Sequence, residues 1–254
     1  MISKAKLKEL SLYKMQKTCE LEHVFVVEGP KMCSEAFSSN LAILTLCATP
    51  EWLQSNRQEV EKRVAQGMEV FEVTLPELER ISGQKTPNQV WMLLQRPVPS
   101  PILEQEPLVV ALDRLQDPGN MGTIIRTCDW FGIRTILCGR DTVSCFNPKV
   151  VQSTMGAIFR TRILYVDLPQ FLPQQQAEGY RVFGALLDGE NIYQTTLPSG
   201  PSILVIGNES RGISPEVQAL VDHRLLIPNL GGTCESLNAS VAAGILISEF
   251  SSRK

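Results

Sequence analysis

The sequence predicts an α/β protein, because short apolar runs alternate with segments of helical periodicity in both halves of the chain. That alternation is typical of a mostly parallel sheet covered by helices on both faces. A second observation concerns prolines 97, 99, 101 and 107, which deny the backbone the donors that a helix or a central strand requires. We therefore predict an N-terminal domain of residues 1–96, a proline-rich linker of 97–107 and a second domain of 108–254.

In the N-terminal half, the apolar runs predict strands at Val24–Val27, Ile43–Cys47, Val70–Val73 and Val90–Leu94. The segments of helical periodicity predict helices at about 3–18, Pro30–Ser38 and Glu51–Gln66. Lysines 4, 6, 8, 14 and 17 stand against the single acid Glu9 in the first seventeen residues. This positive charge could guide RNA electrostatically, or it could be a solvated helix face.

In the C-terminal half, the same signals predict six strands, at Leu108–Leu112, Arg134–Cys138, Thr161–Tyr165, Arg181–Leu186, Ile203–Ile206 and Arg224–Ile227. Helices are expected between them, the clearest at Met121–Phe131, Pro148–Met155, Leu168–Glu178, Pro215–Leu220 and Ala239–Phe250. There is no internal repeat or low-complexity segment that would indicate a solenoid.

Composition excludes several classes of protein. The 254 residues are 43% hydrophobic and 20% charged, enough for one large or two ordinary domains, and the net charge of −3 argues against a surface that coats polyanions generally. Two histidines, and seven cysteines without a C-x-x-C pair, predict no metal site. The odd cysteine count and the lack of an apolar leader predict a cytoplasmic protein. No apolar run approaches the roughly 18 residues that span a membrane.

Ligands of open α/β sheets bind at the carboxyl ends of the strands, so we examined the loops that follow the predicted strands. The first loop, at 117–127, reads D-P-G-N-M-G-T-I-I-R-T. Asn120 is suited to cap the following helix, and Arg126 points away from the apolar stripe of Ile124 and Cys128. Its guanidinium could fork onto a phosphate or carboxylate. By itself, the segment could equally be a capped surface helix with a solvated arginine.

The second loop places two glycines around four polar residues, at Gly207–Gly212, after a buried strand. This arrangement suits close approach of the backbone to a ligand. No lysine follows the second glycine, and G-x-G-x-x-G occurs nowhere, so nucleoside triphosphate and dinucleotide sites lose support. A turn in which Ser214 caps a helix starting at Pro215 would explain the glycines, but it leaves Asn208, Glu209 and Arg211 unexplained.

The third loop begins at Ile227 and leads through a glycine turn into a helix rich in small residues. Ser236 and Asn238 add neutral donors and acceptors close to the free N–H groups of that helix. Ala239, Ala242 and Ala243 permit close packing against another backbone. A tightly packed terminal helix explains the small residues and does not exclude a site.

Together these loops resemble a known family. N-M-G-T-I-I-R-T at 120–127, G-N-E-S-R-G-I-S at 207–214 and I-P-N-L-G-G-T-C-E-S-L-N-A-S-V-A-A-G-I at 227–245 are similar, in order and spacing, to the three motifs of the SpoU (TrmH-like) RNA ribose 2′-O-methyltransferases of the SPOUT superfamily. Many members carry an N-terminal α/β RNA-binding domain that resembles a ribosomal protein. F-V-V-E-G at 25–29 is similar to the strand-to-helix turn of that domain.

The resemblance implies a C-terminal SPOUT domain with a deep trefoil knot, which binds S-adenosylmethionine. By matching positions, the cofactor contacts would be Leu187, Gly189, Gly207, Ile227 and Leu237. The polar residues around the ribose and the methyl donor would be Asn120, Arg126, Glu209, Ser236 and Asn238. The resemblance also implies a homodimer, with the terminal helix Ala239–Phe250 and the helix after Asn120 packed across the two-fold axis.

The residue types restrict the roles that they could take. A guanidinium stays protonated, so we expect Arg126 to grip a phosphate and lower the proton affinity of the hydroxyl, rather than to act as a base. Glu209 would orient Arg126 or Asn120, with a direct role as base as the rival hypothesis. Many family members have glycine where this chain has Ser210. Ser210 and Arg211 could contact a phosphate or simply cap the loop.

The leading hypothesis is a 2′-O-methyltransferase acting on structured RNA, with ribosomal RNA ahead of transfer RNA because the N-terminal extension is a separate domain. The alternative is a non-catalytic RNA-binding or assembly module with the same fold, which would not need all five polar positions. A methyltransferase for a small molecule or a base is disfavoured by Asn120 and Arg126 together with the auxiliary domain. No motif of the sequence predicts the target nucleotide, because proteins recognise RNA through its shape and its unstacked bases.

Overall fold

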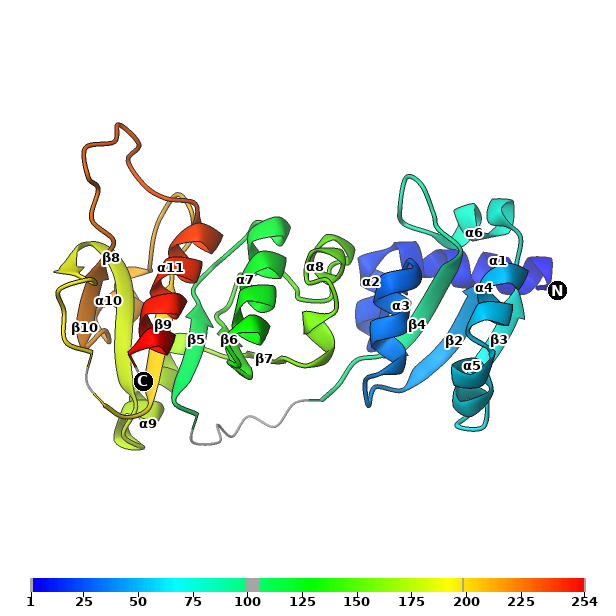
Figure 1. The fold of residues 1–254 in the computed structure, drawn as a ribbon, viewed down its shortest axis with the longest axis horizontal. Coiled ribbons are helices and arrows are strands. Elements are labelled where there is room, and N and C mark those ends of the chain that lie inside the picture. Colours follow the sequence, from blue (N-terminus) through cyan, green and yellow to red (C-terminus); the bar gives the residue numbers. More distant parts are fainter. Residues whose placement is uncertain (1, 99–105, 198, 254) are drawn as a thin grey trace. The chain divides into compact units, whose positions relative to one another are not determined.

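The computed structural model describes residues 2–98, 106–197 and 199–253, which form two compact units (Figure 1). The N-terminal unit contains residues up to 98 together with 146–159, and the C-terminal unit contains the remainder. Most of the predicted linker, residues 99–105, lies outside the described residues.

The N-terminal unit is built on a four-stranded mixed sheet. Its strands are β1 (Val24–Glu28), β2 (Ile43–Ala48), β3 (Glu69–Glu72) and β4 (Val90–Gln95), in the order β1-β4-β2-β3. β4 is antiparallel to both of its neighbours, and β2 and β3 are parallel. The expectation of a mostly parallel sheet is therefore wrong for this half. Alternation of strands and helices does not specify that the last strand inserts between two earlier ones in the reverse direction.

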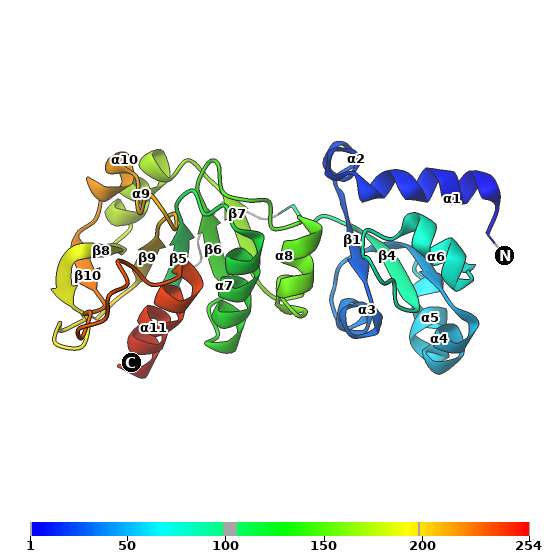
Figure 2. The same cartoon turned by 90° about the horizontal axis from the view of Figure 1, so that it is seen from above.

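Helices cover both faces of this sheet. They are α1 (Lys4–Ser11), the 3₁₀ turn η1 (Leu12–Lys14), α2 (Gln16–Leu21), α3 (Pro30–Phe37), α4 (Pro50–Ser55), α5 (Arg57–Val64) and α6 (Leu75–Ile81). Figure 2 shows α1 and α6 on one face and α3, α4 and α5 on the other. The core on the α1 side includes Leu7, Leu10, Leu78, Ile81 and Trp91.

Two helices expected to be continuous are broken, and one helix was not predicted. Residues 3–18 divide where Met15 adopts an extended conformation, which allows Cys19 to enter the same core as Leu10. Residues 51–66 divide at Asn56, whose Nδ2 donates to the Trp52 carbonyl at 2.8 Å beside its own backbone N–H at 3.1 Å, so that Asn56 ends α4 and precedes α5. The missed helix, α6, begins with a capping box formed by Thr74 and Glu77.

Residues 146–159, which lie within the predicted range of 108–254, pack with the N-terminal unit. They form α8 (Pro148–Ser153) and the 3₁₀ turn η2 (Ala157–Phe159). The ring centroid of Phe25 on β1 lies 4.8 Å from that of Phe146 and 6.5 Å from that of Phe159. The Arg96 guanidinium stacks over Phe146 at 4.8 Å, so aromatic contacts hold this segment on β1.

The C-terminal unit is a six-stranded parallel sheet, as the sequence predicts. The strands are β5 (Leu108–Leu112), β6 (Thr135–Cys138), β7 (Arg162–Tyr165), β8 (Arg181–Asn191), β9 (Ser202–Ile206) and β10 (His223–Leu226). Their order is β10-β8-β9-β5-β6-β7, and every pairing is parallel. Every residue of β5 and β9 is buried, because helices cover both faces at the centre of the sheet.

The helices of this unit are α7 (Pro118–Trp130), α9 (Leu168–Ala177), α10 (Pro215–Gln218) and α11 (Ala239–Ser252). α9 and α10 lie on one face of the sheet and α7 and α11 on the other (Figure 2). α7 and α11 pack directly against each other. Within the described parts of the chain, no helix combines the length and the hydropathy needed to cross a membrane.

Candidate active site

The N-terminus of α7 differs from the prediction in a way that affects the site. The helix begins at Pro118, and its cap is Asp117, whose Oδ1 accepts a hydrogen bond from the backbone N–H of Asn120 at 2.7 Å. The expectation that Asn120 is the cap is therefore wrong. Proline is favoured at the first helical position, and Asp117 directly before it provides the acceptor. The side chain of Asn120 is consequently released from capping.

Asn120 connects the three motif loops through its carboxamide. Its Nδ2 donates to Glu209 Oε1 at 2.8 Å, and its Oδ1 accepts from Asn238 Nδ2 at 2.9 Å. Asn120 itself is only 8% exposed, whereas Glu209 is half-buried and Asn238 is exposed, so the two bonds are partly shielded from water. Of the two partners expected for Glu209, the structure provides Asn120. The three side chains form a directional chain of hydrogen bonds that ends on a carboxylate.

Asn238 uses both ends of its carboxamide. While Nδ2 reaches Asn120, Oδ1 caps α11 by accepting from the backbone N–H groups of Ser240 at 2.9 Å and Val241 at 3.3 Å. The Ser240 hydroxyl also donates to the same oxygen, at 2.7 Å. The start of α11 is thereby tied to the start of α7, which explains why an asparagine suits this position better than serine or aspartate.

The second loop is shaped by two polar residues outside the set selected from the sequence. Asn208 and Gly212 exchange backbone hydrogen bonds of 3.0 and 2.9 Å, which closes the turn that carries Glu209. Asp113, 4% exposed at the end of β5, accepts from the backbone N–H of Ser214 at 2.6 Å. The sequence offered one signal that could have selected both residues: Asp113 and Asn208 are an acid and an amide that follow buried strands. These bonds hold the Glu209 turn against the end of β5.

Two glycines expected at the cofactor site lie where a side chain would collide with backbone. A Cβ on Gly207 would stand 2.3 Å from both Gly212 C and Ile213 N. A Cβ on Gly189 would stand 2.6 Å from Leu225 C, at the point where the register between β8 and β10 shifts. Both glycines are therefore required by the close approach of neighbouring chain segments.

Gly207→Ala is expected to force the Asn208–Gly212 turn open, because backbone atoms cannot yield as a flexible side chain can. We expect a lower melting temperature and faster amide hydrogen exchange in residues 208–212, measured by calorimetry and by hydrogen-exchange mass spectrometry. Gly83→Ala is the matched control, since its Cβ would meet only the Glu28 carboxylate, at 3.6 Å. A Gly207→Ala protein that matched the wild type in both measurements would contradict this account.

The other predicted residues are not drawn into this chain of hydrogen bonds. Ser236 and Leu237 lie in the exposed segment between β10 and α11, which extends from the sheet in Figure 1. Leu187 is 74% exposed and Leu237 48%, whereas Ile227 is half-buried. Arg126 is exposed on α7, as its position relative to Ile124 predicts. The predicted leucines and Arg126 are therefore exposed, whereas Asn120, at the centre of the hydrogen-bonded chain, is buried.

Burial keeps two cysteine thiols of this unit protonated. Burial raises the pKa of the Cys128 thiol on α7 and of the Cys138 thiol on β6 well above the ordinary value, so both stay protonated. Among the residues that the structure describes, no group of three or more His, Cys, Asp or Glu side chains could hold a metal ion.

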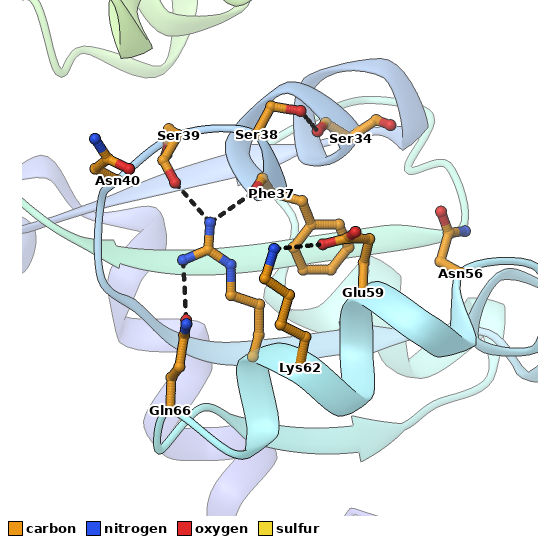
Figure 3. Close-up of a pocket in the computed structure, with 10 residues that line it drawn as sticks. Ser34, Phe37, Ser38, Ser39, Asn40, Asn56, Glu59, Lys62 and Gln66 are labelled. Atoms are coloured by element: carbon orange, nitrogen blue, oxygen red, sulfur yellow. Dashed lines mark hydrogen bonds and ion pairs between the residues drawn. The ribbon is translucent and has the colours of Figure 1, made fainter.

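A polar hollow of about 420 Å³ lies in the N-terminal unit, between the end of α3 and α5 (Figure 3). Arg63 donates from Nη2 to the carbonyls of Phe37 at 2.5 Å and Ser39 at 2.6 Å. Lys62 Nζ lies 3.9 Å from Glu59 Oε2. Both cations are thus engaged within the chain, and Arg63 anchors α5 to the turn after α3.

Two family models match separate parts of the chain. Residues 107–248 match the SpoU rRNA Methylase family, and residues 4–91 match the MRM3-like substrate binding domain. The first match includes all three loops whose side chains meet at Asn120.

Individual proteins are similar over nearly the whole chain. A solved structure of a TrmH-family protein from Porphyromonas gingivalis is 38% identical, with a TM-score of 0.89 and full coverage of both chains. An AdoMet-bound rRNA methyltransferase from Sinorhizobium meliloti is 29% identical, with a TM-score of 0.89 over 98% of this chain and 95% of that one. The 23S rRNA (guanosine(2553)-2′-O)-methyltransferase RlmP of Bacillus subtilis is 29% identical over 89% of this chain and 87% of its own.

Proposed function

Because the chain belongs to the SpoU rRNA Methylase family, we propose that it transfers the methyl group of S-adenosylmethionine to the 2′-hydroxyl of a ribose in ribosomal RNA. The observation that carries this proposal is the chain of hydrogen bonds from Asn238 through Asn120 to Glu209. It brings the three motif loops together at the carboxyl ends of parallel strands, where α/β proteins bind their ligands. A module that only bound RNA would have no need of it.

The exposed apolar side chains fit S-adenosylmethionine. Leu187 and Leu237 would hold the adenine, because aromatic bases pack on apolar surface and both leucines are largely uncovered. Gly189, Gly207 and Ile227 would contribute backbone donors and acceptors. When bound, the cofactor supplies an electrophilic methyl group to an alcohol oxygen.

The polar residues would position the ribose and assist loss of its proton. Asn120 is held by hydrogen bonds at both ends of its carboxamide, so it is oriented before RNA arrives. Glu209 fixes that orientation by accepting from Asn120. Arg126, which remains protonated, would grip a phosphate and lower the proton affinity of the hydroxyl. Ser236, in the exposed segment before α11, would add a hydroxyl to the same site.

The experiment that tests the function is calorimetric titration with S-adenosylmethionine, followed in the same preparation by labelled methyl transfer to ribosomal RNA that lacks the modification. Binding with transfer to a ribose 2′-oxygen is the expected result, and mapping of the label identifies the nucleotide. No binding of S-adenosylmethionine would favour the non-catalytic RNA-binding module.

Three finer features belong to this proposal. The N-terminal unit, matched as a substrate binding domain, would bind RNA with a fold like that of a ribosomal protein. The C-terminal unit would be threaded as a deep trefoil knot, as membership of the SpoU family implies. The protein would act in the cytoplasm.

A homodimer is part of the same proposal, formed through α7 and α11. Trp130 on α7 is 84% exposed and Val241 on α11 50%, an unusual exposure for large apolar side chains on two helices that pack together. Arg126 precedes Trp130 by one helical turn, so an interface on this face would deliver Arg126 to a site shared between subunits.

Trp130→Glu is expected to convert the dimer to a monomer and to abolish methyl transfer, because it places a charge in an apolar interface. Light scattering gives the mass, and labelled methyl transfer gives the activity. Val64→Glu on α5, where the native side chain is 47% exposed, is the matched control and should change neither. A Trp130→Glu protein that remained dimeric would place the interface elsewhere.

A further inference from the structure

Two arginines outside the family's polar set are joined through one side chain. The carboxamide of Asn208 donates from Nδ2 to the backbone carbonyl of Arg114 at 2.9 Å. Its Oδ1 accepts from the backbone N–H groups of Ser210 at 3.0 Å and Arg211 at 3.1 Å. The Asn208 carboxamide therefore bridges the backbones of Arg114 and Arg211. Both lie beside the turn whose Glu209 accepts from Asn120.

Arg114 has a backbone conformation that bulky side chains avoid. It directly follows Asp113 at the carboxyl end of β5, and its φ of 57° is in the left-handed region. Such conformations cost free energy and persist at sites where the surrounding structure enforces them. The Asn208 hydrogen bond to its carbonyl is one such restraint. The strained residue is a cation placed just after β5, at the edge of the sheet where the three motifs meet.

The guanidinium of Arg114 is only partly engaged by the described residues. Its Nε is buried and has no hydrogen-bond partner among them, and Asp113 Oδ1, at 3.8 Å, lies within ion-pair distance but beyond hydrogen-bond distance. The other oxygen of Asp113 is occupied by the Ser214 N–H. The side chain of Arg114 as a whole is 30% exposed, so a ligand can reach the side chain, although not its buried Nε.

Arg211 presents a second exposed cation on a turn of defined shape. The Asn208–Gly212 backbone bonds and the Asn208 side chain fix residues 208–212. The carboxylate two residues earlier, Glu209, already accepts from Asn120, and it lies on the side of the turn that faces α7.

We propose that Arg114 and Arg211 form a phosphate clamp that binds the RNA backbone beside the target ribose, with Asn208 as the positioning residue that sets their spacing. This inference rests on the proposed function and adds two substrate-binding residues to it. Guanidinium groups suit the task because they keep their charge and present donors in a fork that matches phosphate oxygens. It also gives Arg211 a role in binding rather than in capping the loop, since the capping is done by Asn208.

The test measures binding of an unmethylated 23S rRNA transcript as a function of salt. Arg114→Asn is chosen because asparagine tolerates the left-handed region, and Arg211→Gln removes only charge. Each variant should reduce the slope of log K against log salt by about 0.7 to 1, and the double variant by about twice that. Each should also raise the KM for RNA about tenfold, with the Kd for S-adenosylmethionine unchanged.

Arg181→Gln is the matched control, because Arg181 is an exposed arginine at the opposite, amino edge of the same sheet. A salt slope that stays at the wild-type value in the double variant would overturn the clamp. So would a weaker Kd for S-adenosylmethionine with an unchanged slope, since the anion gripped would then be the cofactor's carboxylate. Wild-type protein that neither binds S-adenosylmethionine nor methylates RNA would overturn the proposed function itself, a result distinct from failure of the clamp alone.

Discussion

Arg126→Ala is expected to lower kcat for methyl transfer by two to three orders of magnitude, about the effect of removing one preorganised charge stabiliser from an active site. The Kd for S-adenosylmethionine should stay unchanged. The physical reason is position: Arg126 is exposed on α7, separate from the Asn120–Glu209–Asn238 chain and from the leucines proposed to hold the adenine. Calorimetry and single-turnover methyl transfer measure the two quantities.

Two further variants sharpen this prediction. Arg126→Lys keeps the charge but loses the planar fork, so activity between the wild type and the alanine variant is expected. Arg134→Ala removes an equally exposed arginine next to the amino end of β6, far along the strand from the motif loops, and should leave turnover intact. Unchanged turnover in Arg126→Ala would remove Arg126 from the mechanism.

Asn238 caps α11 and also donates to Asn120, and different substitutions separate these two roles. Asn238→Ala should weaken cofactor binding and turnover together, and it should also lower stability by about 1 kcal/mol through loss of the α11 cap. Asn238→Asp retains an acceptor for the Ser240 and Val241 N–H groups but has no donor for Asn120 Oδ1. We expect it to keep the melting temperature and to lose at least a hundredfold in kcat, as for loss of an oriented active-site donor.

For both variants, thermal unfolding measures stability, calorimetry measures cofactor binding and labelled methyl transfer measures turnover. A fall in melting temperature without any loss of turnover in Asn238→Ala would reduce Asn238 to a helix cap. Normal cofactor binding and turnover in both variants would show that the third motif is misaligned with the site.

Local signals allowed much of the C-terminal unit to be predicted. All six of its strands were expected from apolar runs, which are clearest in β5 and β9 because a strand buried on both faces needs continuous apolar residues. The three loops were found from their place after those strands, and side chains from each of them meet at Asn120. Parallel strands end at one edge of a sheet, so residues far apart in sequence could be expected to lie together.

Other features depended on competition between alternative hydrogen bonds at helix ends, which a short stretch of sequence does not reveal. Asn120 and Asp117 are both good helix caps, and the start of the helix at Pro118 decided between them in favour of Asp117. Asn56 could have remained inside a helix, but its carboxamide shares the Trp52 carbonyl with its own backbone N–H, and α4 ends there. These outcomes depend on which of two nearly equal hydrogen-bonding choices the surrounding structure stabilises.

The sequence by itself determined the α/β class, the strand and loop positions of the C-terminal unit and the family, because apolar periodicity and motif residues are local properties. Only the tertiary structure decided that β4 runs antiparallel between β1 and β2, that residues 146–159 pack on Phe25, and that Asn208 joins Arg114 to Arg211. Each of these features depends on contacts between segments that are far apart in the sequence. Neither the direction of a strand nor the partner of a side chain produces a periodic pattern of residues.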